Sequence, residues 1–509
     1  MLLDSTFGPW LPDMPDYQNP GVTVAYNVSP APGTQRGAIA YEPVYEAKAY
    51  YASASMPSRP LGTAVGKDKL GVAKVYAGNT TQLCKINPAT SNWQNISRSG
   101  GYTTSEGERW ENTEYNGNVF FTNYSNELQW IDKNVDTQFA NATTLVKARH
   151  IATVKDFVVV GNTFDALDGA MPFRVRWSGI GMPVSWDFSQ TTGADFQDVA
   201  GYGAVQAVVG GEAGWIIMEK AVVKMTFTDY PYWFRFDPIP FSKGCTVPQS
   251  VSEPIEGFTY YLANDGFYRM NGNTGQTEAI GAGQIDETFL ASVDTGQYNW
   301  MTVAADPRKK LVYWSYVSTD AEDGTPDKLL IYNYQTGSFS HADATADFVF
   351  NALSLPWTIE ALDVFGSVEN VPASLDSPIW AGGNAMLWGM KKNGSVWVFS
   401  GDTLPATIET GEVYYADILR QAEQGNSDKV TIKAVRAVFD GGGTASVAIG
   451  SRTLSNDDIT YVPRKQLHPQ TGFAYFRSTD RYHRFRLRLS GDWTKAMSLQ
   501  IDAQNAGWR

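Results

Sequence analysis

The sequence has few of the residues that bind metal ions or form disulfide bonds. Its 509 residues include two cysteines, Cys84 and Cys245, and four histidines. The cysteines lie far apart and neither has a partner at metal-ligand spacing, so we expect both to be small buried apolar residues. The histidines are His150, His341, His468 and His483. They form no HExxH motif or comparable ligand set, so we expect neither a metal site nor another cofactor.

Long apolar runs are also absent from the sequence. No stretch of 18 consecutive apolar residues occurs, so no membrane-spanning helix is predicted. The first residues, MLLDSTFGPWLPDMPDY, contain neither a basic region nor a continuous apolar core. We therefore expect no cleaved export signal and a product made in a reducing cytoplasm.

Positive charge is in deficit. Lys and Arg number 40 against 53 Asp and Glu, which gives a formal net charge of −13. A protein that holds nucleic acid without regard to sequence does so by neutralising phosphates with basic side chains. The composition therefore disfavours a tight, sequence-independent grip on DNA by the chain as a whole.

Aromatic and turn-forming residues, by contrast, are abundant. Aromatic side chains make up 13% of the sequence, with 47 glycines and 25 prolines. This density of Gly and Pro leaves little room for long helices, whereas aromatic side chains suit strands. The composition predicts an all-β protein, and the length predicts more than one domain.

The beginning of the chain is rich in proline. The prolines are Pro9, Pro12, Pro15, Pro20, Pro30 and Pro32. Proline fixes φ and donates no backbone hydrogen bond, so residues 1–37 are predicted as an extended arm, with regular structure only after it. Its apolar residues Trp10, Leu11, Tyr17 and Val22 are candidate contacts to a partner subunit. The alternative is that the arm packs on its own chain.

Residues 38–402 repeat one pattern: a short apolar strand, a polar turn and a second short strand. Copies cover residues 75–86, 119–131, 215–227, 258–270 and 386–399. The turns Asn264-Asp265-Gly266 and Lys392-Asn393-Gly394 contain residues that tolerate positive φ, as tight hairpin turns require. Recurrent hairpins without helices between them predict a β-propeller over residues 38–402.

The pattern changes after residue 402. Residues 413–422 are compatible with a short helix, and further strands such as 433–439 follow. Residues 403–509 are therefore predicted as a smaller β-rich C-terminal platform domain, of sandwich type.

One C-terminal segment combines charge with strict alternation. In a strand, Arg484, Arg486 and Arg488 would share one face, with the apolar residues between them on the other. A row of guanidinium groups favours acidic partners, so we expect a carboxylate surface of an adjacent domain or subunit. A solvated face and contact with DNA are the alternatives.

Signatures of catalysis are weak. Gly210, Gly211 and Gly214 are too few and wrongly spaced for a phosphate-binding loop, and they are predicted to form a turn. A propeller can place two carboxylates across a pocket for glycoside hydrolysis. The candidates considered for such a pair are Asp363, Asp376 and Glu409. No recurrent Ser-x-Asp-x-Gly-x-x-Trp box is present, so we expect a protein that is not an enzyme.

The stretch Phe7 to Val28, FGPWLPDMPDYQNPGVTVAYNV, resembles the opening of the tail hub or nozzle proteins of short-tailed bacteriophages, also called packaged-DNA stabilisation proteins. Further segments are similar to the same family. They are residues 175–186, 260–272 and 302–316 and the run 482–488 before Trp493.

The resemblance implies a structural component of the virion tail, made in the host cytoplasm, with a β-propeller and an additional β platform. It implies a ring of six copies beneath the portal and adaptor that encloses the DNA ejection channel and helps retain the packaged genome. The implied partners are other copies of the chain, the portal-side adaptor and other tail proteins. DNA would pass through the lumen without specific binding, because an acidic wall repels phosphates. The alternative is that the acidic charge faces water.

Two other functions remain as alternatives. One is a carbohydrate-binding propeller of a phage or bacterial surface, with Trp and Tyr side chains as sugar platforms. The other is a glycoside hydrolase. A ring with a central hole would favour the tail protein. Saturable binding to a polysaccharide would favour the carbohydrate-binding propeller. Sugar release that one Asp or Glu substitution abolishes would favour the glycoside hydrolase.

Overall fold

A computed structural model covers residues 1–509 and describes all of them except 18, 36, 52–53, 88–89, 106, 136, 167, 345, 355–365, 368–370, 372–373, 375–384, 416–427 and 507–509. The described residues are mostly β-strand, with three short helices: η1 (Pro248–Ser250), α1 (Asp286–Ser292) and η2 (Thr295–Trp300). The prediction of an all-β protein is confirmed.

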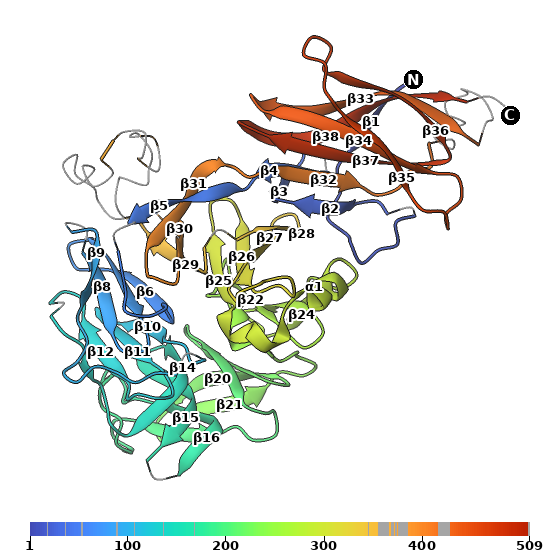
Figure 1. Ribbon diagram of the computed structural model, residues 1–509. Coiled ribbons are helices and arrows are strands. Elements are labelled where there is room, and N and C mark those ends of the chain that lie inside the picture. The colour runs from blue at the N-terminus through green and yellow to red at the C-terminus, as the bar shows by residue number, and fades with distance from the viewer. Residues whose placement is uncertain are drawn as a thin grey trace.

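Six separate sheets and four strands of a longer, nine-stranded sheet form the seven blades of a β-propeller (Figure 1). In the described part of the chain, six blades have four strands and one has three. The first two blades are β6 (Gly62–Lys67), β7 (Ala73–Gly78), β8 (Leu83–Asn87) and β9 (Asn92–Asn95), then β10 (Glu111–Tyr115), β11 (Asn118–Thr122), β12 (Gln129–Asp132) and β13 (Ala140–Asn141). The next two are β14 (Val146–Val154), β15 (Phe157–Asp165), β16 (Gly169–Trp177) and β17 (Asp195–Asp198), then β18 (Val205–Val209), β19 (Gly214–Met218), β20 (Val222–Asp229) and β21 (Trp233–Pro238).

The remaining three blades complete the ring. They are β22 (Phe258–Leu262), β23 (Phe267–Asn271) and β24 (Thr277–Ala279), then β25 (Thr302–Asp306), β26 (Leu311–Tyr316), β27 (Lys328–Asn333) and β28 (Ser338–Asp343), and finally β29 (Phe348–Leu353), β30 (Ala385–Met390), β31 (Val396–Thr403) and β5 (Tyr45–Tyr51). The last blade takes its fourth strand from the beginning of the chain, because β5 pairs with β31. Two distant segments of the sequence therefore close the propeller.

The hairpins predicted from the repeated pattern are present. Residues 75–86, 119–131, 215–227, 258–270 and 386–399 each contain two neighbouring antiparallel strands of one blade. Gly394 has φ +82° and a Cβ there would lie 2.8 Å from a Met56 side-chain atom, so this turn requires glycine for both conformation and space.

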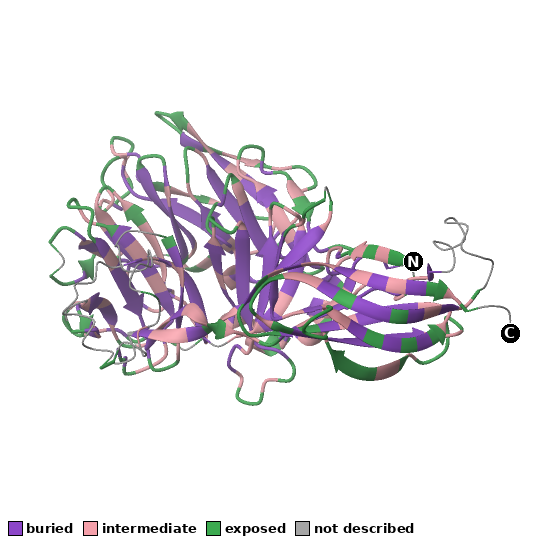
Figure 2. Cartoon of the chain, turned by 90° about the horizontal axis from the view of Figure 1, so that it is seen from above, coloured by how far each residue is buried: buried purple, intermediate pink, exposed green. Residues whose placement is uncertain are grey.

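The platform consists of two packed sheets. One joins β3 (Val28–Pro32), β4 (Ile39–Pro43), β38 (Trp493–Asn505), β33 (Val430–Gly441) and β36 (Phe473–Asp480), with β1 (Leu2–Thr6) also paired to β38. The other joins β2 (Val22–Tyr26), β32 (Ala406–Thr410), β37 (Tyr482–Ser490), β34 (Thr444–Arg452) and β35 (Thr460–Gln466). Buried and exposed residues alternate along platform strands, as Figure 2 shows, because one face of each sheet lies against the core.

The platform and the propeller are continuous. Strand β2 pairs with β32 on one side and, in parallel at Tyr26 and His341, with the blade strand β28 on the other. A nine-stranded sheet therefore runs from one blade into the platform. One apolar cluster likewise extends from Trp314 of that blade to Phe485 and Leu499 of the platform.

The beginning of the chain departs from the prediction of an extended arm over residues 1–37. Strands β1, β2 and β3 lie within this range, and all three belong to the platform sheets. Strand β4, assigned to the propeller by the predicted boundary at residue 38, also belongs to the platform. Proline does not prevent this pairing, because Pro30 and Pro32 lie in β3. Among the described strands, β3 pairs only with β4 and is therefore at an edge of the sheet.

At the other predicted boundary, the blade strand β31 ends at Thr403 and the platform strand β32 begins at Ala406. Most of the short helix suggested for residues 413–422 lies outside the described residues.

Candidate functional site

The proline-rich segment at the start of the chain contacts both the propeller and the platform. Trp10 lies 4.6 Å from the imidazole of His341, between ring centroids, and its indole nitrogen donates to the Thr23 carbonyl at 3.1 Å. Trp10, Leu11 and Val22 are all buried within the chain. The prediction that these three side chains contact a partner subunit is therefore wrong. These three side chains instead pack on their own chain, which was the alternative prediction.

Tyr17 is the exception among the four arm residues. Its side chain is 44% exposed, and its ring lies edge-on to Tyr482 at 5.6 Å between centroids. Of the predicted arm contacts, Tyr17 therefore retains surface that a partner can reach.

A carboxylate of the same segment caps the α-helix of the propeller. Asp13 accepts hydrogen bonds from the backbone nitrogens of Glu287 and Thr288 at 2.9 and 2.8 Å. The residue before the helix, Ile285, has no side chain able to do this. Asp13 thus satisfies the free amides at the start of α1 and anchors the segment to the blade formed by β22–β24.

The arginine-rich segment forms strand β37, as predicted. Phe485, Leu487 and Leu489 are buried in the platform core, and the arginines lie on the opposite face. Arg484 is buried, Arg486 is about one-third exposed and Arg488 is exposed. Alternation along the strand therefore predicted the two faces correctly.

The carboxylate that Arg484 and Arg486 share belongs to the neighbouring strand of the same platform, not to an adjacent domain or subunit as predicted. Glu409 of β32 has 1% of its side chain exposed and accepts from Arg486 Nε at 2.5 Å and from Arg484 Nη1 at 3.3 Å. Tyr461 of β35 donates its hydroxyl to the same carboxylate. Burial, together with the hydrogen bond to Glu409, raises the pKa of Tyr461 to about 12, so this hydroxyl remains protonated.

The same cluster reaches the proline-rich segment. Arg484 Nη2 lies 2.5 Å from Asp16 Oδ2, so one guanidinium bridges a platform strand and the beginning of the chain. A second buried pair, Arg452 and Glu412 at 2.6 Å, lies in the same platform. Sequence patterns predicted neither this pair nor the role of Glu409 as a partner for the arginines, because the partners lie 40 or more residues apart in the chain.

Two histidines are buried where the proline-rich segment meets the rest of the chain. Burial is the main cause that lowers the pKa of His341 and of His483 to about 4 in each case. His341 packs against Trp10 and Tyr26, and His483 lies near Tyr415. Both imidazoles are therefore neutral at pH 7 and act as packing groups.

The innermost strands of the propeller enclose a central pocket of about 710 Å³, called the propeller channel below. It is lined by β6, β10, β14, β18, β25 and β29 and, in the remaining blade, by the segment around Pro248 to Ile255. Its titratable groups include Arg109, Glu111 and Glu253, and Glu111 lies 2.9 Å from the ring of His150. Burial raises the pKa of Glu253.

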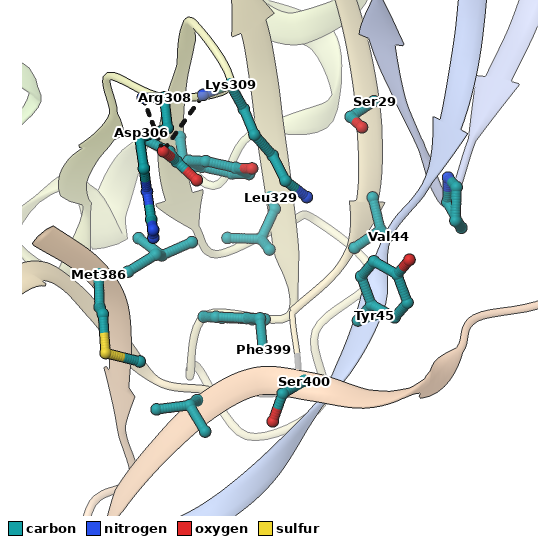
Figure 3. A pocket seen from close by; sticks show the side chains of 14 residues that line it. Ser29, Val44, Tyr45, Asp306, Arg308, Lys309, Leu329, Met386, Phe399 and Ser400 are labelled. Carbon is teal, nitrogen blue, oxygen red and sulfur yellow. Dashed lines mark hydrogen bonds between the residues drawn. The ribbon is translucent and has the colours of Figure 1, made fainter. Parts of the chain in front are cut away.

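A smaller pocket of about 180 Å³ lies between the last two blades and the platform (Figure 3). Asp306 accepts from the backbone nitrogens of Arg308 and Lys309, so its carboxylate holds the tight turn between β25 and β26. Arg308 reaches across to the Ala385 carbonyl at 2.8 Å. Val44, Leu329 and Phe399 contribute apolar surface to the pocket. We therefore interpret it as a gap in the packing between blades and not as a catalytic site.

The other residues considered for catalysis or metal binding form no common site among the described residues. Asp363 and Asp376, two of the carboxylates considered for a hydrolase, lie outside the described residues, and Glu409 is engaged by the arginines. Gly210 and Gly211 lie in the turn between β18 and β19, as predicted, whereas Gly214, predicted in the same turn, is the first residue of β19. Among the described residues, no group of three His, Cys, Asp or Glu side chains is placed to hold a metal ion.

The two cysteines are buried, as predicted. Burial raises the pKa of both thiols to about 12, so neither is a reactive thiolate. Among the described residues, the helices are too short and too polar to span a membrane.

Fold and site together define an all-β protein in which a seven-bladed propeller carries a β platform. No family model and no curated protein matches the chain. Among solved structures, the extracellular domain of the putative one-component system BT4673 from B. thetaiotaomicron is similar at 11% identity and a TM-score of 0.41, over 78% of this chain and 43% of that one. BamB from Moraxella catarrhalis is similar at 12% identity and 0.34, over 67% and 85%. A chain of the mitotic checkpoint complex is similar at 10% identity and 0.37, over 70% and 94%. The chain thus spans less than half the length of the first of these.

Proposed function

We propose that this chain is a structural virion protein that forms the tail hub or nozzle ring of a short-tailed bacteriophage. In this role it encloses the DNA ejection channel, helps retain the packaged genome and carries out no catalysis. The other copies of the chain, the portal-side adaptor and further tail proteins are its partners.

The observation that carries the proposal is the resemblance of residues 7–28 to the opening of that family. The propeller with a β platform, which the same resemblance implies, is the architecture of this chain. Residues 7–28 also contribute directly to this architecture, since β2 lies between the platform and a blade. The stretch that resembles the family is therefore one that joins the two parts.

The continuous packing of propeller and platform is suited to a rigid wall around a DNA channel. A nine-stranded sheet and one apolar cluster cross from the propeller to the platform, so the chain resists bending between them. The net charge of −13 supports a DNA conduit, because acidic walls repel phosphates and let the duplex slide.

The test is the oligomeric state of the purified full chain, alone and mixed with a portal–adaptor complex. We expect a ring with a central hole in negative-stain images, formed by the chain alone or on that complex, and a mass of six copies. A chain that stays monomeric alone and also fails to bind the portal–adaptor complex would overturn the proposal.

Carbohydrate binding is a second candidate, favoured by exposed aromatic side chains in one blade of the propeller. Tyr230 and Tyr232 connect β20 to β21 and are 63% and 81% exposed. Exposed aromatic rings of this kind can stack on the apolar faces of sugars. Saturable binding to a host surface polysaccharide would support this candidate if Tyr232→Ala weakens the binding and Tyr475→Ala, in the platform, does not. Equal binding by the two variants would contradict it.

A further inference from the structure

The most unusual charge in the described residues lies at one end of the propeller channel. Arg109 precedes β10 and lines the channel cavity. It donates one hydrogen bond from Nη2, to the backbone carbonyl of Asn299. Its other guanidinium nitrogens, Nε and Nη1, are buried and have no hydrogen-bond partner in the described part of the chain.

Among the described residues, Arg109 also has no carboxylate partner. Four other arginines with largely buried guanidiniums each have a carboxylate within 4 Å in the part of the chain described; they are Arg174, Arg176, Arg452 and Arg484. No such ion pair involves Arg109 among the described residues. A buried cation without a counter-charge is costly, so this position differs from the rest of the fold.

A second cation lies on the same aromatic ring. The guanidinium carbon of Arg59 lies 3.6 Å from the ring centroid of Trp300, and that of Arg109 lies 4.8 Å from it. Burial lowers the pKa of Arg109 to about 9, with the positive charge of Arg59 as the second cause. The two like charges therefore raise each other's energy, which an anion between or beside them would relieve.

The fold places these side chains at one mouth of the channel. Arg59, Arg109 and Trp300 each lie just before the first strand of a blade, namely β6, β10 and β25. Neighbouring first strands line the same channel, so their beginnings meet at one end of it. Phe348, the first residue of β29, lies 5.7 Å from the Arg109 guanidinium carbon and completes an apolar surround.

We infer that this mouth of the channel binds a small oxyanion, a carboxylate or a phosphate, against Nε and Nη1 of Arg109, with Arg59 supplying a second positive charge. Guanidinium donors match the oxygens of both groups, and charge-assisted hydrogen bonds in a desolvated site are the strong ones. The channel volume is that of a small-molecule site. The site does not depend on the proposed tail function.

The test uses the purified full chain with potassium phosphate, potassium succinate and potassium chloride at equal ionic strength. We expect phosphate or succinate to raise Tm by about 2 °C or more over chloride, because a ligand that binds the folded state alone stabilises it. Which of the two acts identifies the group recognised. Calorimetric titration then gives Kd.

Two variants assign the effect to this site. Arg109→Gln should weaken oxyanion binding about tenfold or more, and Arg109→Lys should weaken it less because the charge remains. Arg269→Gln, which alters an arginine already paired with Glu278, should leave binding unchanged. If Arg109→Gln does not fold, Arg109→Lys carries the comparison, and it must bind more weakly than wild type. The inference is overturned if neither oxyanion exceeds chloride with the wild-type chain, or if the folded Arg109 variants bind as the wild type does.

Discussion

Glu409 and Arg486 occupy directly opposed positions on β32 and β37, with Arg486 Nε 2.5 Å from Glu409 Oε2. Because Arg484 and Tyr461 donate to the same buried carboxylate, one acidic side chain organises three strands of the platform. Through Arg484 and Asp16 the same cluster holds the beginning of the chain.

Removal of this carboxylate should destabilise the platform. We expect Glu409→Ala to lower the free energy of unfolding by about 3 kcal/mol, because it leaves a buried guanidinium and a phenol without their acceptor. Glu278→Ala is the matched control, since Glu278 is 64% exposed and its pair with Arg269 contributes less than about 1 kcal/mol. Urea unfolding followed by tryptophan fluorescence measures both. Equal losses in the two variants would show that the cluster contributes no more than a surface pair.

Acid should loosen the contacts around the buried histidines. The pKa of His341 and of His483 is about 4 in the folded chain, below the value of about 6.5 expected when unfolded. A depressed histidine pKa means that the unfolded chain takes up protons first. This contribution to stability is therefore complete above pH 6.5 and is lost as the pH falls from 6.5 towards 4.

Charged side chains near these histidines also affect their pKa values. Lys328 and Asp343 act on His341 with opposite signs, and Asp480 acts on His483. We expect the double variant His341→Gln/His483→Gln to show a smaller fall in Tm between pH 6.5 and pH 4 than the wild type does. The control is His468→Gln, at an exposed position, and its Tm should fall as much as that of the wild type. A double variant as acid-sensitive as the wild type would rule out these two imidazoles as the source.

The turn at Gly394 should reject any side chain. Gly394 and Gly71 have nearly the same φ, +82° and +81°, but a Cβ at Gly394 would meet Met56 whereas a Cβ at Gly71 would meet nothing within 4 Å. Gly71→Ala should cost about 1 kcal/mol through the backbone alone, and Gly394→Ala about 2 to 3 kcal/mol. Thermal unfolding of both variants separates backbone strain from crowding. Equal losses would mean that Met56 moves aside freely.

Closure of the propeller should depend on Tyr50. This side chain of β5 is fully buried, and its ring lies 5.1 Å from that of Trp388 in the same blade. Tyr50→Ala should destabilise the blade by about 3 to 5 kcal/mol and speed hydrogen exchange in β31, the strand that pairs with β5. Tyr45→Ala, on the same strand but partly exposed, is the control and should have a smaller effect. Exchange in β31 that is no faster in Tyr50→Ala than in Tyr45→Ala would contradict this account of closure.

Assembly should depend on the predicted interface residues that remain exposed. Tyr17 of the predicted arm and Arg488 of β37 are exposed, whereas Trp10, Leu11 and Val22 are buried. If the chain forms a ring, Tyr17→Ala/Arg488→Glu should reduce the ring fraction at least about tenfold, since aromatic and arginine side chains dominate interface energies. Lys69→Glu, the same charge change on an exposed loop of the first blade, should assemble normally. Light scattering at matched concentrations measures the ring fraction, and full assembly of the double variant would remove both residues from the interface.

The sequence alone was sufficient for the features that depend on neighbouring residues. Alternation from Arg484 to Leu489 predicted both faces of β37, and the turns ending in Gly266 and Gly394 predicted hairpins. Side-chain period and turn conformation are local properties, so the residue order carries them.

Tertiary structure decided what depends on segments far apart in the chain. The pairing of β5 with β31, the burial of Trp10 and the contact of Glu409 with Arg484 and Arg486 each join segments more than 70 residues apart. Proline density predicted an extended arm because it limits local hydrogen bonding, but the apolar surface between the prolines found cover on the same chain. The meeting of Arg109 with Trp300 follows in the same way from ring closure, since only a closed propeller brings the beginnings of β10 and β25 to one mouth of the channel.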